Sequence, residues 1–260
     1  MFESFRELYS YRCMIRNLVK RDIRGRYKGS VLGVLWNLLL PLVQIIVYVM
    51  VFTTIFKPDI DNYAIYMITG MVLWFYFSDC LSEGSYVLVA NGDMLKKIYF
   101  PRIALPISVV LARLVNFLIM TAVLIFILAI TGYGISPVAL LFYPLLVLLF
   151  IIFMVGMATI FSALDVFFRD VQYIITAILM ALIWLTPIMY LREKVEYPIL
   201  DTIITINPMT YYTEMMQSIF YWQSIPSIGT ILTCAGISIG VFGIGFILFK
   251  YLEKDFAEVL

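Results

Sequence analysis

The stretch Ser136–Leu164 is SPVALLFYPLLVLLFIIFMVGMATIFSAL, and it contains no charged residue. A helix rises ~1.5 Å per residue, so a run of this length exceeds the ~30 Å of hydrocarbon in a bilayer. Backbone polar groups find no water in that layer and must pair within the segment itself. The stretch therefore predicts a transmembrane helix.

Apolar runs of this kind recur along the chain, whose 260 residues are 63% hydrophobic and 13% charged, with a mean hydropathy of +0.99. Soluble domains have roughly 45–50% apolar and about 25% charged residues, so the surplus apolar surface must face lipid. We expect an all-α polytopic membrane protein of one domain, residues 1–260, with a six-span bundle over residues 31–260. The expected spans are Val31–Phe56, Tyr63–Leu81, Ile103–Ile130, Ser136–Leu164, Val171–Leu191 and Ile228–Leu252.

Lysine and arginine are unevenly distributed between the two sides of these spans. They crowd residues 1–30, recur at 96–102 and follow the last span, whereas the other side has Lys57, Arg192 and Lys194. Positively charged loops remain in the cytoplasm during membrane insertion. The pattern therefore predicts that both termini are cytoplasmic.

Segments outside the spans are where contacts with partners are expected. Read as a helix, Arg12–Lys28 has basic residues at i, i+4 spacing opposite an apolar face, which predicts an amphipathic helix in the cytoplasmic interface. The loop Asn91–Arg102 predicts a short cytoplasmic helix, and the proline-interrupted stretch Arg192–Ser227 predicts a re-entrant external pair of short helices. The basic ridge comprises Arg12, Arg16, Lys20, Arg24 and Lys28.

Several chemistries are excluded by what the sequence lacks. Without histidine the chain has no imidazole for acid–base catalysis and lacks the commonest metal ligand. Cys13, Cys80 and Cys234 form no CxxC pair, so neither a zinc site nor a redox pair is indicated. No GxxxxGKS or GxxxxGKT phosphate cradle occurs, so the chain is expected to be no enzyme and to bind no cofactor. A net charge of +1 gives no indication of a nucleic-acid partner.

Five stretches, in chain order, carry a resemblance to a known family. They are RDIRGRYKGSVLGVLW at Arg21–Trp36 followed by Pro41, NGDMLKKIYFPR at Asn91–Arg102, FFRD at Phe167–Asp170, TPI at Thr186–Ile188 with Asn207 and Pro208, and FAEVL at Phe256–Leu260. Together they resemble the ABC-2 type permeases that export polysaccharide such as O-antigen, capsule or teichoic acid. The match spans nearly the whole chain.

The resemblance implies a homodimer in the bacterial cytoplasmic (inner) membrane, joined by two copies of a cytoplasmic ABC ATPase subunit that binds ATP and Mg. It implies that a polyprenyl-diphosphate or other lipid-linked glycan, as in lipopolysaccharide, moves through a central channel. The alternatives are a membrane-embedded transferase acting on lipid-linked sugars, an ion-coupled carrier, or an ABC-2 exporter of another lipid or drug. Scattered acidic residues disfavour the transferase, and the scarcity of deep charges disfavours the carrier.

Candidate site residues follow from these segments. Clustered cations at a low-dielectric boundary bind phosphate oxygens, so the basic helix is expected to capture the substrate diphosphate, although it could merely anchor the chain to headgroups. The residues proposed for diphosphate capture are Arg21, Arg24, Arg26 and Lys28.

The loop at 91–102 combines lysines with more apolar side chains than a solvated loop needs, which suits docking into a protein groove. The resemblance places the coupling helix of the family here, whereas the alternative is a segment resting on lipid headgroups. The residues proposed for ATPase coupling are Asp93, Leu95, Lys96, Lys97, Phe100 and Pro101.

Aromatic residues make up 16% of the chain and gather near span ends. An interfacial aromatic belt explains most of them, but rings also offer sliding surfaces to the C–H faces of sugars. The candidates for lining a channel are Trp36, Trp74, Tyr76, Trp184, Tyr190, Tyr211 and Tyr212.

Two features inside the spans indicate contacts between helices. Arg113 lies in an apolar run, where an unpaired charge costs several kcal/mol, and Asp79 and Glu83 are the candidates to pair with it unless it lies near the cytoplasmic surface. Gly236 and Gly240 have the spacing that allows close approach between helices.

Overall fold

The computed structural model describes residues 10–25, 35–56, 58–97 and 100–256, and this part of the chain contains helices and no strand. The all-α prediction is therefore confirmed. The elements are α2 (Arg12–Gly25), α3 (Trp36–Val51) continued by the π-helix η2 (Phe52–Phe56), α4 (Tyr63–Ala90), α5 (Gly92–Lys97), α6 (Ala104–Ile130), α7 (Pro137–Leu140), α8 (Tyr143–Phe167), α9 (Val171–Leu182), η3 (Arg192–Lys194), α10 (Pro198–Ile206), α11 (Pro208–Phe220) and α12 (Ile228–Leu252).

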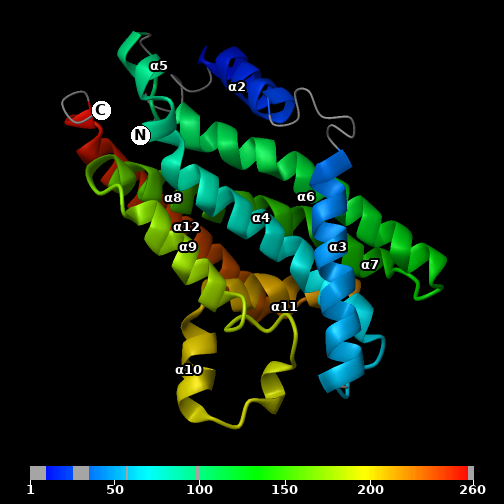
Figure 1. Ribbon diagram of the computed structural model, residues 1–260. Coiled ribbons are helices and arrows are strands. Elements are labelled where there is room, and N and C mark those ends of the chain that lie inside the picture. Colours follow the sequence, from blue (N-terminus) through cyan, green and yellow to red (C-terminus); the bar gives the residue numbers. More distant parts are fainter. Residues whose placement is uncertain (1–9, 26–34, 57, 98–99, 257–260) are drawn as a thin grey trace.

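Four long helices, α4, α6, α8 and α12, form the centre of the bundle (Figure 1). α4 packs against both α6 and α8 and is buried along most of its length. α2, α5 and the last turns of α12 lie at one end of the bundle, which we call the α5 end, and α10 lies at the opposite α10 end. The start of α2 and the end of α12 thus share one end.

Five helical segments of the described chain are long and apolar enough to cross a membrane, and they match the first, second, third, fourth and sixth predicted spans. α9 has 12 residues, which cover ~18 Å. Its expected continuation to Leu191 is not observed, because Pro187 removes a backbone donor and disfavours helical geometry at the residue before it. The five long segments are Leu38–Phe56, Tyr63–Ala90, Ala104–Ile130, Pro137–Phe167 and Ile228–Leu252.

The irregular segment 183–191 after α9 is held by side chains of neighbouring helices. The hydroxyl of Tyr66 donates to the carbonyl of Tyr190 at 2.8 Å and lies 3.2 Å from that of Pro187. The amide of Gln217 donates to the Pro187 carbonyl at 3.0 Å. Irregular backbone at membrane depth requires such internal partners, and α4 and α11 supply them.

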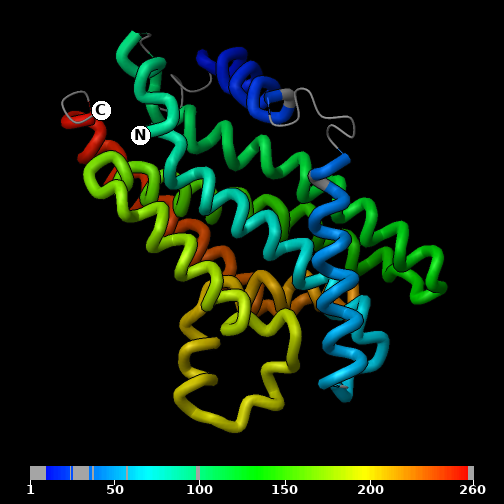
Figure 2. The backbone as a smooth tube through the Cα atoms, viewed as in Figure 1, coloured from blue at the N-terminus to red at the C-terminus, as the bar shows by residue number. Residues whose placement is uncertain are grey.

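The predicted pair of short helices in 192–227 is confirmed as α10 and α11 (Figure 2). α11 packs against α4, α8 and α12, and its residues Tyr212 and Met216 are fully buried. Prolines begin both helices, where a missing backbone N–H costs nothing. The chain therefore leaves the bundle in α10 and returns to it in α11.

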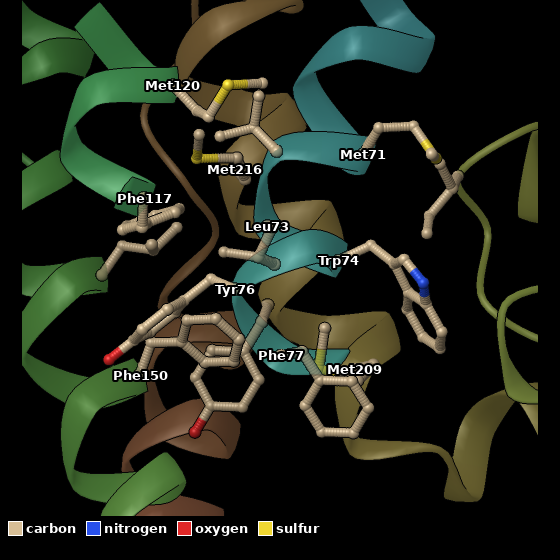
Figure 3. Packing of buried hydrophobic residues seen from close by; sticks show 14 of the residues in the cluster. Met71, Leu73, Trp74, Tyr76, Phe77, Phe117, Met120, Phe150, Met209 and Met216 are labelled. Atoms are coloured by element: carbon tan, nitrogen blue, oxygen red, sulfur yellow. The ribbon is translucent and has the colours of Figure 1, made fainter. Parts of the chain in front are cut away.

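The core between α4, α6 and α8 is rich in aromatic rings and methionines (Figure 3). Tyr76 stacks on Phe117 with ring centroids 5.0 Å apart and meets Phe150 edge-on at 5.5 Å. Offset and edge-to-face arrangements are those that aromatic pairs prefer.

Glycines bring α8 and α12 into backbone contact. A Cβ added to Gly245 would lie 2.6 Å from the carbonyl oxygen of Gly156, and one added to Gly156 would lie 2.7 Å from the Phe242 nitrogen. Gly236 and Gly240 make no close approach within the described part of a single chain, since nothing lies within 4 Å of a Cβ built there. Within the chain the close approach uses Gly245, on another face of the last span, and packing through Gly236 and Gly240 stays a prediction.

Candidate functional site

Arg113 joins three helices at the α5 end. Its guanidinium forms ion pairs with Asp22 of α2 at 2.7 Å and with Glu83 of α4 at 2.8 Å, and its side chain is 3% exposed. Glu83 was one of the two predicted partners, and Asp79 lines the same cavity as Arg113. Asp22 was missed because no sequence period indicates that an interface helix folds onto a particular span. The pairing offsets the cost of burying the charge.

α2 is amphipathic as predicted, but its apolar face packs on the bundle. Leu18 is buried within a cluster at the α5 end, whereas Arg12, Arg16 and Lys20 are exposed. Arg21 donates to the side-chain oxygen of Asn91 at 2.7 Å, which ties α2 to the turn before α5. α2 is therefore fixed to both α6 and the α4–α5 corner.

Only part of the basic cluster proposed for diphosphate capture lies within the described residues. Arg24 lies within the last turns of α2, and Arg26 and Lys28 lie outside the described residues. Arg21 is directed at α5 rather than away from the bundle. The geometry thus assigns Arg21 a structural contact and leaves the capture of diphosphate to be tested on the others.

α5 confirms the short helix expected in 91–102. Asp93, Lys96 and Lys97 are exposed on it, and Leu95 is half-buried. Phe100, which was proposed for docking of the ATPase, is instead buried: its side chain is 5% exposed and belongs to the apolar cluster at the α5 end. Pro101, half-buried, leads directly into α6, as a residue with fixed φ is suited to do.

The last described residues fold back onto the α5 end. Phe256 is fully buried and meets Phe249 edge-on at 5.5 Å and Phe167 at 5.9 Å. The Arg102 guanidinium lies 5.8 Å from the centre of the Phe256 ring and donates to the Glu253 carbonyl at 2.6 Å. Three of the stretches that carried the family resemblance, those at 91–102, 167–170 and 256–260, therefore meet here. Residues 257–260 lie outside the described residues.

Asp165 was not singled out in the sequence, although it is an acidic residue inside an apolar run. Its side chain is fully buried, and one carboxylate oxygen accepts the backbone N–H of Gln172 at 3.2 Å. A carboxylate at the first turn of a helix interacts favourably with the helix dipole. Asp165 thus links the end of α8 to the start of α9 across the FFRD turn.

Asn207 organises the α10 end. Its amide donates to the Thr186 hydroxyl at 2.9 Å and to the Leu185 carbonyl at 3.3 Å. Its side-chain oxygen accepts the N–H of Met209 at 3.0 Å and so caps α11. The TPI and Asn-Pro stretches are therefore held together by the hydrogen bonds of the Asn207 side chain.

The predicted channel aromatics fall into three groups. Trp74 and Tyr212 are 4% and 0% exposed and belong to the core, where Tyr212 shares a 2.6 Å hydrogen bond with Ser238. Trp36 and Tyr76 line a cavity of about 260 Å³ beside Arg113. Trp184 and Tyr190 line another cavity at the α10 end, and Tyr211 is half-buried there with its hydroxyl bonded to the Thr205 carbonyl at 3.0 Å.

A charged network at the α10 end was not predicted. The guanidinium of Arg192 faces the carboxylates of Asp201 and Glu214 and donates to the Thr205 hydroxyl at 2.7 Å. Burial raises the pKa of Glu214, although Arg192 counteracts the rise. Burial opposes the charge of Arg192, but the two carboxylates outweigh it and raise its pKa. Arg192, Asp201 and Glu214 lie on three separate short helices, η3, α10 and α11, and no sequence period indicates that these helices meet.

These features define a multi-pass helical membrane protein with a cluster of ion pairs at each end of its bundle: one around Arg113 and one around Arg192. The family model described as ABC-2 type transporter matches residues 14–221. The O-antigen export system permease protein RfbA of Myxococcus xanthus is 31% identical over 260 residues, covering 99% of each chain. A protein of the same name from Klebsiella pneumoniae is 31% identical over 253 residues, covering 94% of this chain and 93% of its own. The chain belongs to the ABC-2 type transporter family.

Proposed function

We propose that this chain is the membrane-spanning permease subunit of an ATP-driven exporter that moves a lipid-linked polysaccharide of the O-antigen type out of the cytoplasm. The observation that carries the proposal is the match to the Myxococcus xanthus protein, which is named for O-antigen export, over 99% of both chains. A match of this extent includes both ends of the bundle, not only its apolar helices.

The functional unit is a homodimer with two copies of a cytoplasmic ABC ATPase that holds ATP and Mg. The absence of a phosphate-cradle motif from the sequence supports a separate ATPase. The basic residues of α2 and α5 support a cytoplasmic position of the α5 end and therefore of both termini, in the bacterial inner membrane.

The ATPase docks on α5. The exposed side chains of Asp93, Lys96 and Lys97 and the half-buried Leu95 support a protein contact of mixed charge around an apolar residue. Arg21 of α2 is hydrogen-bonded to Asn91, just before α5. A displacement of α5 by the ATPase is therefore transmitted to α2. Resting on lipid headgroups is the alternative role of the same lysines.

Capture of the lipid diphosphate is assigned to the basic end of α2, through Arg24, Arg26 and Lys28. Cations near a bilayer surface attract anionic groups at about 1 kcal/mol per charge. Arg21 contributes indirectly, by holding α2 against the α4–α5 corner.

The experiment that tests the proposed function is deletion of the gene followed by fractionation of the glycan. We expect complete lipid-linked polysaccharide to accumulate inside the cell and to disappear from the surface, and expression of the chain to reverse this. A transferase would instead leave an incomplete glycan. Surface polysaccharide at its normal level in the deletion strain would refute the proposal.

A further inference from the structure

The α10 end contains a cavity of about 610 Å³ between the segment after α9, α10, α11 and the start of α12. Its walls bring together charged, amide and hydroxyl side chains from parts of the chain far apart in sequence. Those used below are Arg192, Asp201, Glu214, Gln217 and Trp222. Cavities that bind small groups combine a largely preformed shape with a few convergent polar groups, as this one does.

The carboxylates in this cavity keep spare hydrogen-bonding capacity. Arg192 lies 3.4 Å from Asp201 and 3.3 Å from Glu214, longer than the ~2.7–2.9 Å of a tight charge-assisted bond. Within the described part of the chain, the second oxygen of each carboxylate accepts no hydrogen bond. The network is therefore built to accept further donors.

An aromatic cavity of about 330 Å³ adjoins the polar one, and the two share Leu191 and Val195 in their walls. Trp184 and Tyr190 line the aromatic side. The Tyr190 hydroxyl is buried and has no hydrogen-bond partner among the described residues. On the polar side, the Trp222 ring is 55% exposed. Aromatic side chains therefore line both cavities, on either side of the wall that Leu191 and Val195 form between them.

We propose that these two cavities form a carbohydrate-binding site for sugar units of the exported chain, a role that rests on the proposed function. The carboxylates of Asp201 and Glu214 accept hydrogen bonds from sugar hydroxyls, and the Arg192 guanidinium and the Gln217 amide donate to those hydroxyls. The aromatic side chains pack on the C–H faces of the sugar. Binding of a free phosphate is disfavoured because the two negative charges of Asp201 and Glu214 outnumber the single positive charge of Arg192. A divalent cation is disfavoured because the guanidinium lies between the two carboxylates.

The site is tested by binding of the cell's own polysaccharide, released from its lipid by mild acid and labelled with a fluorophore. The protein is held in lipid nanodiscs, and binding is measured by fluorescence polarisation. We expect Asp201→Asn with Glu214→Gln to weaken binding about tenfold, since charged acceptors hold hydroxyls more strongly than neutral ones. Asp61→Asn is the matched control, because Asp61 is exposed at the same end and lines neither cavity.

Trp222→Leu provides a second variant that leaves the ion pairs intact, and it should also weaken binding. If the double variant does not fold, the Trp222 variant decides the question. Binding unchanged in the variants that fold, or lowered equally by Asp61→Asn, would overturn the site. The deletion strain separates the two proposals: intracellular glycan accumulation together with unaltered binding by the variants rejects the site alone, whereas normal surface glycan in that strain rejects the export function itself.

Discussion

Neutralising both partners of Arg113 should release α2 from the bundle. The Arg113 side chain is 3% exposed, and those of Asp22 and Glu83 are 33% and 30% exposed. Removing both partners leaves a buried charge uncompensated, which costs about 3–5 kcal/mol. Either single change leaves one partly exposed pair in place and should cost about 1 kcal/mol. We expect Asp22→Asn with Glu83→Gln to lower the free energy of unfolding by more than the sum of the single changes.

Arg113→Met is the informative comparison, because it removes the buried charge and leaves two carboxylates that water reaches. Its cost should be about 1–2 kcal/mol, below that of the double variant, since an apolar side chain of similar size is tolerated where an ion pair was buried. Unfolding is followed by tryptophan fluorescence during titration with SDS in mixed micelles. A probe on Cys13, which is exposed on α2, reports release of that helix. If Arg113→Met proves the more damaging change, compensation of the buried charge is not what holds α2.

Three further predictions concern the packing and docking surfaces. Phe256→Ala should lower the free energy of unfolding by about 3–5 kcal/mol, because the ring is fully buried, and a thermal melt in detergent measures this. Leu95→Ser should weaken copurification of the ATPase, whereas Lys96→Gln with Lys97→Gln should leave it nearly intact; the reverse order would indicate headgroup binding. Gly245→Ala should reduce the yield of folded protein, since its methyl group would lie 2.6 Å from a backbone oxygen of α8, and normal yield would contradict that packing.

The spans could be predicted because lipid imposes a simple requirement on the sequence. A segment surrounded by hydrocarbon must be long, apolar and helical, and each of these properties is local. α8 illustrates this, since its composition alone predicted the helix. The short helix α5 was also predictable, because Asn91 and Pro101 punctuate the chain on either side of it.

What could not be predicted depends on contacts between distant residues. Phe100 and Leu95 are both apolar residues of the same loop, yet Phe100 is buried within the cluster at the α5 end, whereas Leu95 is half-buried and packs against its edge. The partner Asp22 of Arg113 lies on a helix whose placement is set by tertiary packing. The network around Arg192 joins η3 to α10 and α11, and no sequence period connects these three helices.

α4 connects the two ends of the molecule physically. Near one terminus it presents Glu83 to Arg113, and near the other it presents Tyr66 to the irregular segment after α9. Its 28 residues form one unbroken α-helix that spans ~42 Å. A displacement of the α5 end must therefore either move the Tyr66 end as a rigid body or break the hydrogen bonds that hold residues 183–191. Because those bonds satisfy buried or partly buried backbone carbonyls, breaking them is costly, and rigid-body movement is the less expensive response.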